Sequence, residues 1–395
     1  MAVSPENMSD NLDSAFGKGF LARRSPGDWL WAAGVLAATI GVLWMYAETM
    51  ARVEIAILLG TAVALLALGW AFRPLRLFAT AVGAASLLAI WLYGGNLAAA
   101  EQSFLLNYVL ASQSAIMWMS ALYVLATVAY FSGLFTRSGW IAGTGSALAW
   151  VATGMGFVGL LVRWRETYLV DPAIGYIPIS NLYEAFILFC VVTGLLWLFY
   201  EHRYQARHLG GFVLSIITLA VAFLLWYSFE RAGHEIEPLV PALNSYWMKI
   251  HVPTNFVGYG AFALAAMVGV AYLLRERLQR TRPDSAVLGR LPATAVLDDL
   301  MYKSIALGFA FFTIATFLGA IWAAEAWGSY WNWDPKEAWA LIVWLTYAGW
   351  LHMRLTKGWH GAPMAWWAVI GLLVTAFCFL GVNMFLSGLH SYGEL

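Results

Sequence analysis

The sequence predicts an all-α membrane protein that crosses the bilayer about eleven times. Of its 395 residues, 62% are hydrophobic and only 11% are charged, whereas soluble domains carry about 25% charged residues. Apolar runs of about 18 or more residues, long enough to cross a hydrocarbon core as helices, recur along the whole chain. The formal net charge is zero, so the chain offers no basic surface for nucleic acid, and we expect no nucleic-acid partner.

The Lys and Arg residues of the loops predict how the helices are oriented. With a cytoplasmic N-terminus, sixteen of the 22 Lys and Arg residues fall on the cytoplasmic side and six on the other side. The C-terminus is then expected on the outer face, together with loops 230–254 and 327–339. The predicted spans are residues 29–46, 55–72, 77–97, 115–135, 140–161, 182–200, 211–229, 255–274, 305–324, 338–353 and 366–386.

The first three predicted helices carry no His and no Cys. We interpret them as an added unit for packing or for binding a partner. The two cysteines of the chain, Cys190 and Cys378, each lie inside an apolar run and form neither a C-x-x-C pair nor a C-x-x-C-H attachment site for covalent haem. We therefore expect no covalently bound haem on this chain.

The stretch Trp-Gly-Ser-Tyr-Trp-Asn-Trp-Asp-Pro-Lys-Glu-Ala-Trp, residues 327–339, is the most unusual part of the sequence. An ordinary membrane interface places one or two Trp or Tyr residues at a helix end. This stretch instead combines four tryptophans with Tyr330 and three charged side chains. Such a density of rings predicts a flat platform at the membrane surface for a large planar ligand with charged edges, and haem is such a ligand. The aromatic residues of the platform are Trp327, Tyr330, Trp331, Trp333 and Trp339.

Two of the seven histidines are expected on the same face as this platform. His251 precedes Pro253, which suits a first helical turn, so His251 is predicted at or just before a helix start. His390 follows the last helix. Imidazole nitrogen is a common ligand of haem iron, and two histidines from opposite sides make a six-coordinate site. The aromatic rings would cover the porphyrin, and Lys336 or Arg231 can meet its propionates.

His352 and Glu184 each allow two interpretations. His352 lies eighteen positions after Asp334 on one predicted helix, or roughly 27 Å away. It either caps the helix beside Arg354 or contributes to a second, inner haem site, whose other ligand would have to come from a partner subunit. Glu184 opens a helix that Asn181 or Ser180 can cap; it either serves in that first turn or tunes a haem ligand or propionate. The other four histidines, His202, His208, His234 and His360, are interpreted as polar loop or helix-end residues.

The Trp-rich stretch, continued to Leu351-His-Met-Arg, resembles the WWD signature of the CcsA family of haem-handling proteins, also called ResC or CcsB. Three shorter motifs match as well: Ser-Asn-Leu-Tyr-Glu at 180–184, Tyr-Trp-Met-Lys-Ile-His at 246–251 and Gly-Leu-His-Ser-Tyr-Gly at 388–393. The resemblance runs from about residue 115 to the C-terminus. It implies an eight-helix haem-handling domain at 115–395, with its WWD loop at 325–339, after an N-terminal extension at 1–114.

The resemblance implies a role in cytochrome c biogenesis at the cell membrane. His251 and His390 match the two outer histidines that ligate haem iron, and Trp327, Trp331, Trp333, Asp334 and Pro335 match the loop that supports the haem. His352 matches a transmembrane histidine that acts with a ResB/CcsB-type membrane subunit. Haem b would be carried non-covalently across the membrane and presented on the outer face to apocytochrome c, whose C-x-x-C-H thiols are kept reduced by a separate pathway. This is a holocytochrome c synthase, or haem lyase, activity of a complex, with no catalytic nucleophile expected on this chain.

Two other functions compete with this one. A membrane cytochrome b that carries electrons pairs histidines on facing helices at matched depths on both sides, and here the inner side offers one histidine within a span. A solute transporter would favour Gly/Pro-broken helices at mid-membrane, and the sequence has no convincing pair of them.

Overall fold

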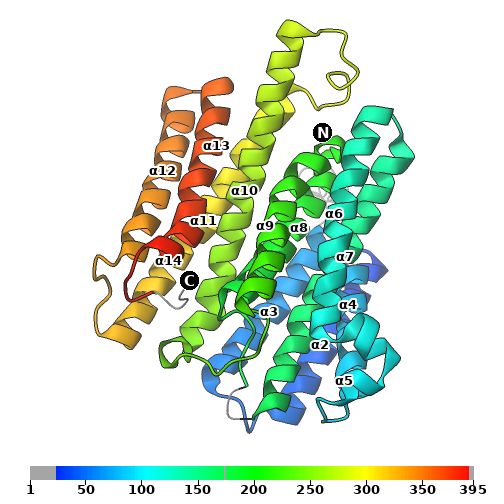
Figure 1. Cartoon of the computed structure of the whole chain (residues 1–395), viewed down its shortest axis with the longest axis vertical. Coiled ribbons are helices and arrows are strands. Elements are labelled where there is room, and N and C mark those ends of the chain that lie inside the picture. The colour runs from blue at the N-terminus through cyan, green and yellow to red at the C-terminus, as the bar shows by residue number, and fades with distance from the viewer. Residues whose placement is uncertain (1–23, 173–174, 391–395) are drawn as a thin grey trace, which may run out of the picture. The chain divides into compact units, whose positions relative to one another are not determined.

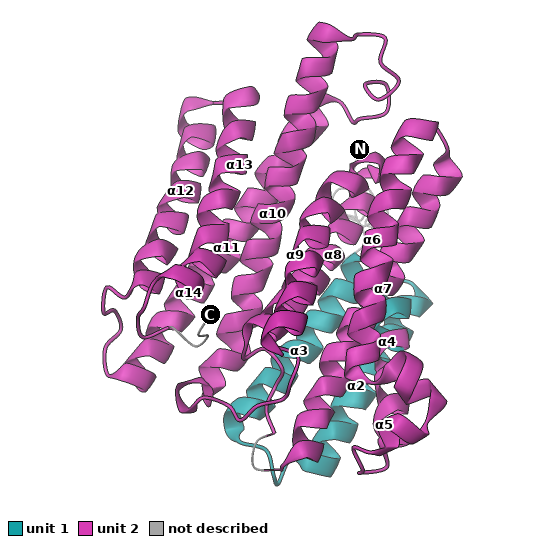
Figure 2. Ribbon diagram, in the orientation of Figure 1, with its two compact units in different colours: residues 1–80 teal, residues 81–395 magenta. Residues whose placement is uncertain are grey.

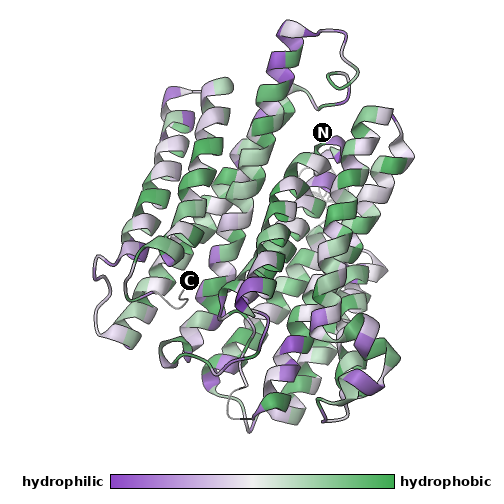
Figure 3. Cartoon of the chain, viewed as in Figure 1, coloured by the Kyte–Doolittle hydropathy of each residue, from purple (hydrophilic) through white to green (hydrophobic). Residues whose placement is uncertain are grey.

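The computed structural model describes residues 24–172 and 175–390, and these residues form helices and connecting loops without a β-strand. Ten helices are long and apolar enough to cross a membrane, which confirms the predicted all-α polytopic class. Hydrophobic residues predominate along the helices, and polar residues gather at helix ends and loops (Figure 3). The long helices in Figure 1 are α2 (Pro26–Tyr46), α3 (Arg52–Ala71), α4 (Pro74–Tyr93), α6 (Ser112–Thr136), α7 (Gly139–Val170), α8 (Leu182–Tyr204), α9 (Gly210–Arg231), α10 (Tyr246–Thr281), α11 (Thr294–Trp327), α12 (Pro335–Lys357) and α13 (Ala362–Ala376).

All eleven predicted spans correspond to helices, but α12 is not among the ten that satisfy the criteria for a membrane span. Its 23 residues are long enough. Its interior, however, carries three tryptophans, a tyrosine and His352, and these side chains lower its mean hydropathy. The last span is interrupted: α13 continues through a π-helical turn, η4 (Phe377–Gly381), into the short helix α14 (Val382–Phe385).

The chain forms two compact units, residues 1–80 and 81–395 (Figure 2). Their boundary falls inside α4, earlier than the expected end of the N-terminal extension at residue 114. The later part of that extension, which includes α5 (Ala99–Gln102) and η1 (Leu106–Leu110), is bonded to α7. The Tyr93 hydroxyl and the Ser112 backbone N–H donate to the Glu166 carboxylate over 2.6 and 2.9 Å. The division into an extension and a haem-handling domain stays a prediction about function.

Helix α10 lies at the centre of the larger unit, where it packs against α8, α9, α11 and α13. Small residues allow this close packing: a Cβ added at Gly308 of α11 would lie 2.7 Å from the Phe262 ring of α10. The same Phe262 ring stacks on the Tyr347 ring of α12, with centroids 3.5 Å apart. These contacts fix α10, α11 and α12 against one another, and the candidate site lies at one end of these three helices.

The prediction that His251 sits at or before a helix start is wrong. Helix α10 begins at Tyr246, where the Ser245 hydroxyl accepts a bond from the Trp247 N–H, and Pro253 lies inside the helix. The cap and the following residues evidently stabilise the added turn by more than the backbone hydrogen bond that Pro253 removes. His251 is therefore more than one turn inside α10, half-buried against α11 rather than at the rim.

Candidate functional site

The loop between α11 and α12, residues 328–334, is held at both ends by local backbone chemistry. Gly328 ends α11 in the left-handed region, with φ of 77°, a conformation that costs glycine little. At the other end Asp334 and Glu337 form a reciprocal capping box on α12, and Pro335 occupies the first helical turn. Trp333, between them, has a positive φ of 56°. Residues other than glycine rarely adopt this backbone conformation.

Asp334 joins this loop to the chain after the last helix. Its carboxylate accepts hydrogen bonds from the Leu389 backbone N–H over 2.6 Å and from His390 Nδ1 over 2.8 Å. Gly388 makes this approach possible, because a Cβ there would lie 2.2 Å from Asp334 Oδ1. The Trp327 ring then packs edge-on against the His390 ring, with centroids 4.7 Å apart. The loop and His390 thus form one connected structure.

The electrostatics of this pair favour a neutral imidazole beside a charged carboxylate. Burial lowers the pKa of His390 below its usual 6.5, although the Asp334 carboxylate raises it in part. Burial also tends to raise the pKa of Asp334, but bonds from the Lys336 N–H, His390 and the Leu389 N–H hold it below its usual value. At neutral pH His390 is therefore uncharged and Asp334 is ionised.

His251 is held from the opposite side by α11. Its Nδ1 lies 2.8 Å from the Ala315 carbonyl oxygen, and its ring packs edge-on against Trp322 at a centroid distance of 5.7 Å. Gly319 lies under the ring, since a Cβ added there would be 2.8 Å from His251 Cε1. These three contacts fix the position of the imidazole.

Both histidines are held as the same tautomer. A carbonyl oxygen or an ionised carboxylate can only accept, so Nδ1 of each imidazole must carry the proton and donate it. The basic lone pair of each ring is then on Nε2. A histidine whose Nδ1–H is bonded to a carbonyl or carboxylate is the usual arrangement of a metal-ligating histidine.

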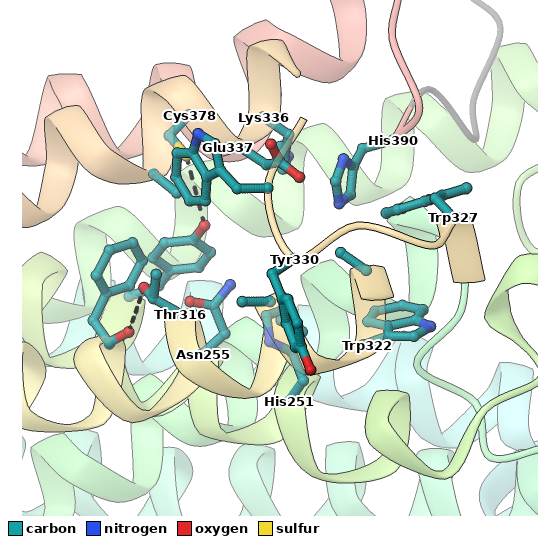
Figure 4. Close-up of a pocket in the computed structure, with 17 residues that line it drawn as sticks. His251, Asn255, Thr316, Trp322, Trp327, Tyr330, Lys336, Glu337, Cys378 and His390 are labelled. Atoms are coloured by element: carbon teal, nitrogen blue, oxygen red, sulfur yellow. Dashed lines mark hydrogen bonds between the residues drawn. The ribbon is translucent and has the colours of Figure 1, made fainter. Parts of the chain in front are cut away.

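The two histidines line the same cavity, which Figure 4 shows with His251 and His390 on different elements. This cavity has a volume of about 120 Å³. A second cavity of about 160 Å³ extends from it toward the start of α8. Ligand pockets usually enclose about 300–1,000 Å³, so a large ligand would need both spaces. Six residues border both cavities: His251, Asn255, Tyr259, Trp322, Lys336 and His390.

The other predicted site residues take different positions around these cavities. Trp327, Tyr330 and Trp331 line the first cavity together with the histidines. Trp333 is exposed and packs edge-on against Trp331, with centroids 5.8 Å apart. Asp334 caps α12 and Pro335 is its first residue, so both fix the end of the loop. The Trp339 ring packs against the Phe377 ring, with centroids 4.3 Å apart.

Glu184 is part of neither cavity lining, although its neighbours Ser180, Asn181 and Ala185 line the second cavity. It is fully buried, and its carboxylate pairs with Arg163 of α7 over 2.8 Å. The other oxygen accepts from the backbone and hydroxyl of Ser180, while Asn181 caps the helix as expected. The Arg163 guanidinium also donates to the carbonyls of His234 and Glu235. Glu184 therefore anchors α8 to α7 and, through Arg163, to the loop that precedes α10.

His352 lies near the opposite end of α12, exposed on the helix surface. From Pro335, the first residue of the helix, it is about 26 Å along the axis, so it is not brought together with His251 and His390. The neighbouring His360 instead joins Asp298 and Arg354 in a polar cluster at that end. Within the described residues no group of three or more His, Cys, Asp or Glu side chains is arranged to hold a metal ion.

Sequence reasoning missed several residues of the cavity. Asn255 and Tyr259 follow His251 at intervals of four along α10, and that helical spacing was the available signal. Glu337 lines the cavity too, with one carboxylate oxygen bonded to the Asn332 N–H and the other buried without a hydrogen-bond partner among the described residues. The sequence pattern Asp-Pro-Lys-Glu indicates that Glu337 takes part in a capping box. It does not indicate that Glu337 lines the cavity.

Lys336 lines both cavities, where its ammonium could pair with a haem propionate. Its ammonium donates to the Phe379 carbonyl and to Asn383 Oδ1, both over 3.0 Å. The Phe379 carbonyl belongs to the π-helical turn η4; such turns often occur at functional sites. Cys378 of the same turn also lines the cavity.

Comparison with known proteins identifies the family. Residues 179–390, which contain α8 to α14 and both cavity histidines, match the family described as "Cytochrome C assembly protein". The chain belongs to this family. It is 35% identical over 291 residues to the cytochrome c biogenesis protein CcsA of Guillardia theta, a match that covers 69% of this chain and 93% of that protein. The CcsA protein of Chlorella vulgaris is 34% identical over 318 residues, which cover 73% and 96% of the two chains.

The match with the CcsA protein of Chlamydomonas reinhardtii is 39% identical over 240 residues and covers 59% of this chain but only 64% of that protein. Among solved structures, the cytochrome c haem lyase CcmF has a similar fold, with a TM-score of 0.52 and 17% sequence identity. That likeness covers 69% of this chain and 48% of CcmF. It supports the helical architecture alone.

Proposed function

We propose that this member of the family binds haem b non-covalently with His251 and His390 as iron ligands and presents it to apocytochrome c for covalent attachment. One observation carries the proposal: both imidazoles line one aromatic cavity, and an acceptor on Nδ1 of each leaves Nε2 as the basic nitrogen. Trp327, Tyr330 and Trp331 supply apolar ring surface around them. This donor set suits haem iron, for which paired histidines are common ligands.

The size of the site bears on how haem is held. Neither cavity alone matches a large ligand, but the residues shared by the two spaces include both histidines and Lys336. A flat ligand that occupied both spaces would therefore contact the two imidazoles and the ammonium together. Movement of the shared side chains or of loop 328–334 would join the spaces, and Lys336 would pair with a propionate.

The chemistry of attachment belongs largely to the substrates. Each apocytochrome thiol adds across a haem vinyl group, so that sulfur bonds to one carbon, the thiol hydrogen goes to the other, and no net redox change occurs. The chain's own contribution is to hold the ring plane and the vinyl edge in position, which can supply a large share of a rate enhancement. The histidine of the apocytochrome would then replace one of the two ligands from this chain.

The direction of transport rests on the predicted orientation. With the C-terminus on the outer face, His251, His390 and the loop 328–334 present haem outside the cell membrane. Exposed His352, at the other end of α12, would act with a histidine of a ResB/CcsB-type subunit in an inner site. The separate thiol-reducing pathway would keep the apocytochrome cysteines competent for addition.

Maturation of a reporter cytochrome c tests the proposal. The chain and its partner subunit would be co-expressed with an apocytochrome, and covalent haem would be measured on a denaturing gel. His251→Ala and His390→Ala should each lower covalent haem at least about tenfold, whereas His202→Ala, an exposed control, should leave it unchanged. Full maturation in the first two variants would refute the proposal, and a protein that carried haem without maturing the reporter would favour an electron-carrying cytochrome b.

A further inference from the structure

We propose that the N-terminal unit, residues 1–80, holds an anionic phospholipid, with one acyl chain between α2 and α3 and its phosphate at the arginines near the start of α2. The unit contains a cavity of about 710 Å³, lined by residues of α2, α3 and the first turns of α4. This cavity is larger than the two at the histidine site, and the proposed function makes no use of it.

The cavity arises because α2 and α3 touch at one end and separate beyond it. At the contact, a Cβ on Gly69 would lie 2.1 Å from Trp31 Nε1, which donates to the Leu65 carbonyl. Only one turn along α2 from Trp31, a Cβ on Gly34 would meet no atom within 4 Å. The lining of α2 runs from Gly27 to Val42, a length of about 22 Å.

The interior of the cavity is apolar. Its three threonines each donate their hydroxyl to a carbonyl of their own helix: Thr39 to Val35, Thr61 to Ile57 and Thr80 to Arg76, all over 2.8 Å. Because these hydroxyls are satisfied locally, the surface that faces the cavity consists mainly of methyl, methylene and indole groups, with Arg76 as its charged lining residue. An alkyl chain is a suitable occupant.

Positive charge gathers at one end of the cavity. Asp28 forms ion pairs with Arg76 and, over 3.9 Å, with Arg73. The Arg24 guanidinium lies 4.6 Å from the centre of the Trp70 ring, whose Nε1 donates to the Asp28 carbonyl. Two guanidiniums thus pair with one carboxylate and a third lies against Trp70. The other acidic residues of the described part of this unit, Glu48 and Glu54, lie near the opposite helix ends.

This charge excess decides between ligands. In a bilayer every lipid tail is as apolar as the cavity wall, so the acyl chain alone gives no selectivity. Selectivity must come from the headgroup, and basic pockets between transmembrane helices on the cytoplasmic side suit anionic headgroups. In the predicted orientation these arginines are on the cytoplasmic side, and Arg73, 69% exposed, can reach a phosphate at the membrane surface.

The volume argues against a transmembrane helix of a partner subunit as the occupant. A helix with its side chains is about 10–12 Å wide, so a 22 Å length of it fills roughly 1,700–2,500 Å³. The cavity offers 710 Å³. A single acyl chain fits this space without separating α2 from α3.

The test uses the full chain in nanodiscs of equal parts phosphatidylglycerol and phosphatidylcholine, followed by native mass spectrometry of the lipids retained. Phosphatidylglycerol should be retained preferentially. Gly34→Leu fills the cavity and should abolish that retention, while Gly60→Leu, at a position of α3 with equally open space outside the lining, should not. Arg73→Gln should weaken retention about fivefold, and Arg52→Gln, near the far end of α3, should not change it.

Several outcomes would overturn the proposal. Equal retention of both lipids would remove the role of the arginines, and equal retention in Gly34→Leu and Gly60→Leu would remove the role of the cavity. Soluble glycerol phosphate that stabilised the chain as well as phosphatidylglycerol would eliminate the acyl chain. Loss of the partner subunit from purified Gly34→Leu, with lipid retention unchanged, would show that a protein helix binds there instead.

Discussion

At the scale of single residues, the acceptors on the two Nδ1 atoms matter as much as the imidazoles themselves. The Ala315 carbonyl and the Asp334 carboxylate each fix a ring orientation and a tautomer. Partners of this kind raise the basicity of a ligating imidazole and hold it before a metal arrives. Two of the residues behind the histidines, Asp334 and Gly319, can be changed without removing either ligand.

Replacing Asp334 with Asn keeps an acceptor and a good helix cap but removes the charge beside His390. We expect haem affinity to fall about 10–100-fold, measured by absorbance titration of the purified protein. Asp284→Asn, on an exposed loop, is the matched control. Unchanged affinity in Asp334→Asn would show that His390 is not a ligand held by this carboxylate.

Asp334→Asn also tests the direction in which Asp334 shifts the pKa of His390. Iron binding needs neutral His390, whose pKa burial holds below 6.5, so haem should be retained at pH 7 and released as the pH falls below that lowered pKa. Since the Asp334 carboxylate raises the pKa of His390, its removal in Asp334→Asn should lower the pKa of His390 in the haem-free protein, measured by NMR titration of the imidazole. A pKa of His390 that rose in Asp334→Asn would contradict this assignment of charges.

Gly319→Ala tests the position of His251 from behind. The new Cβ would lie 2.8 Å from His251 Cε1, closer than carbon atoms can approach, so the imidazole must leave the position in which Ala315 and Trp322 hold it. Haem affinity should fall roughly tenfold or more. Gly83→Ala, where a Cβ meets no atom within 4 Å, should bind haem normally. Equal binding by both variants would exclude a fixed His251.

At the scale of helices and loops, the site depends on how α7, α8 and the loop before α10 are tied together. The Arg163–Glu184 pair is almost completely buried, with side-chain exposures of 1% and 0%. Removing one partner of such a pair leaves an uncompensated charge and typically costs about 3–5 kcal/mol. This large cost favours an anchoring role for Glu184 over direct contact with haem.

Glu184→Gln should therefore lower the free energy of unfolding by about 3–5 kcal/mol, measured by thermal or denaturant unfolding in detergent. The haem spectrum of the protein that remains folded should be unchanged. Glu276→Gln breaks the exposed pair with Arg280 and should cost at most about 1 kcal/mol. An altered haem spectrum in folded Glu184→Gln would show that Glu184 acts on the haem site and is not only an anchor between helices.

The sequence predicted some of these features well because their signals are local. Span positions follow from hydropathy, and the Trp-rich stretch is contiguous. The start of α10 was misplaced because the cap at Ser245 outweighs Pro253, a balance that composition does not reveal. The partner of Glu184 is Arg163 on another helix. Glu337 lines a cavity to which α10, α11, α12 and η4 all contribute. Neither arrangement has a signature in the local sequence.

At the scale of the whole chain, α12 connects two different surfaces. Its first turn lies at the candidate haem site, and His352 is exposed about 26 Å away. Within the described residues, His352 belongs to no group of three or more His, Cys, Asp or Glu side chains that could hold a metal ion. A ligand from a partner subunit would complete an inner site at this position.

His352→Ala should consequently lower haem loading only when the partner subunit is present. Added imidazole should restore the loading, because it can occupy the vacated coordination position. The measurement is the ratio of haem absorbance to protein in the purified complex, with His360→Ala as the neighbouring control. Unchanged haem loading in His352→Ala would show that His352 is not a ligand of an inner haem site.

The central claim is that His251 and His390 are the two iron ligands of one haem, and the absorption spectrum of the purified chain with its partner tests it most directly. The wild-type protein should give the spectrum of a low-spin, bis-histidine haem. Changing both His251 and His390 to Ala should abolish that outer haem and leave the helical fold intact by circular dichroism. If the double variant retained the full bis-histidine spectrum, the claim would be contradicted.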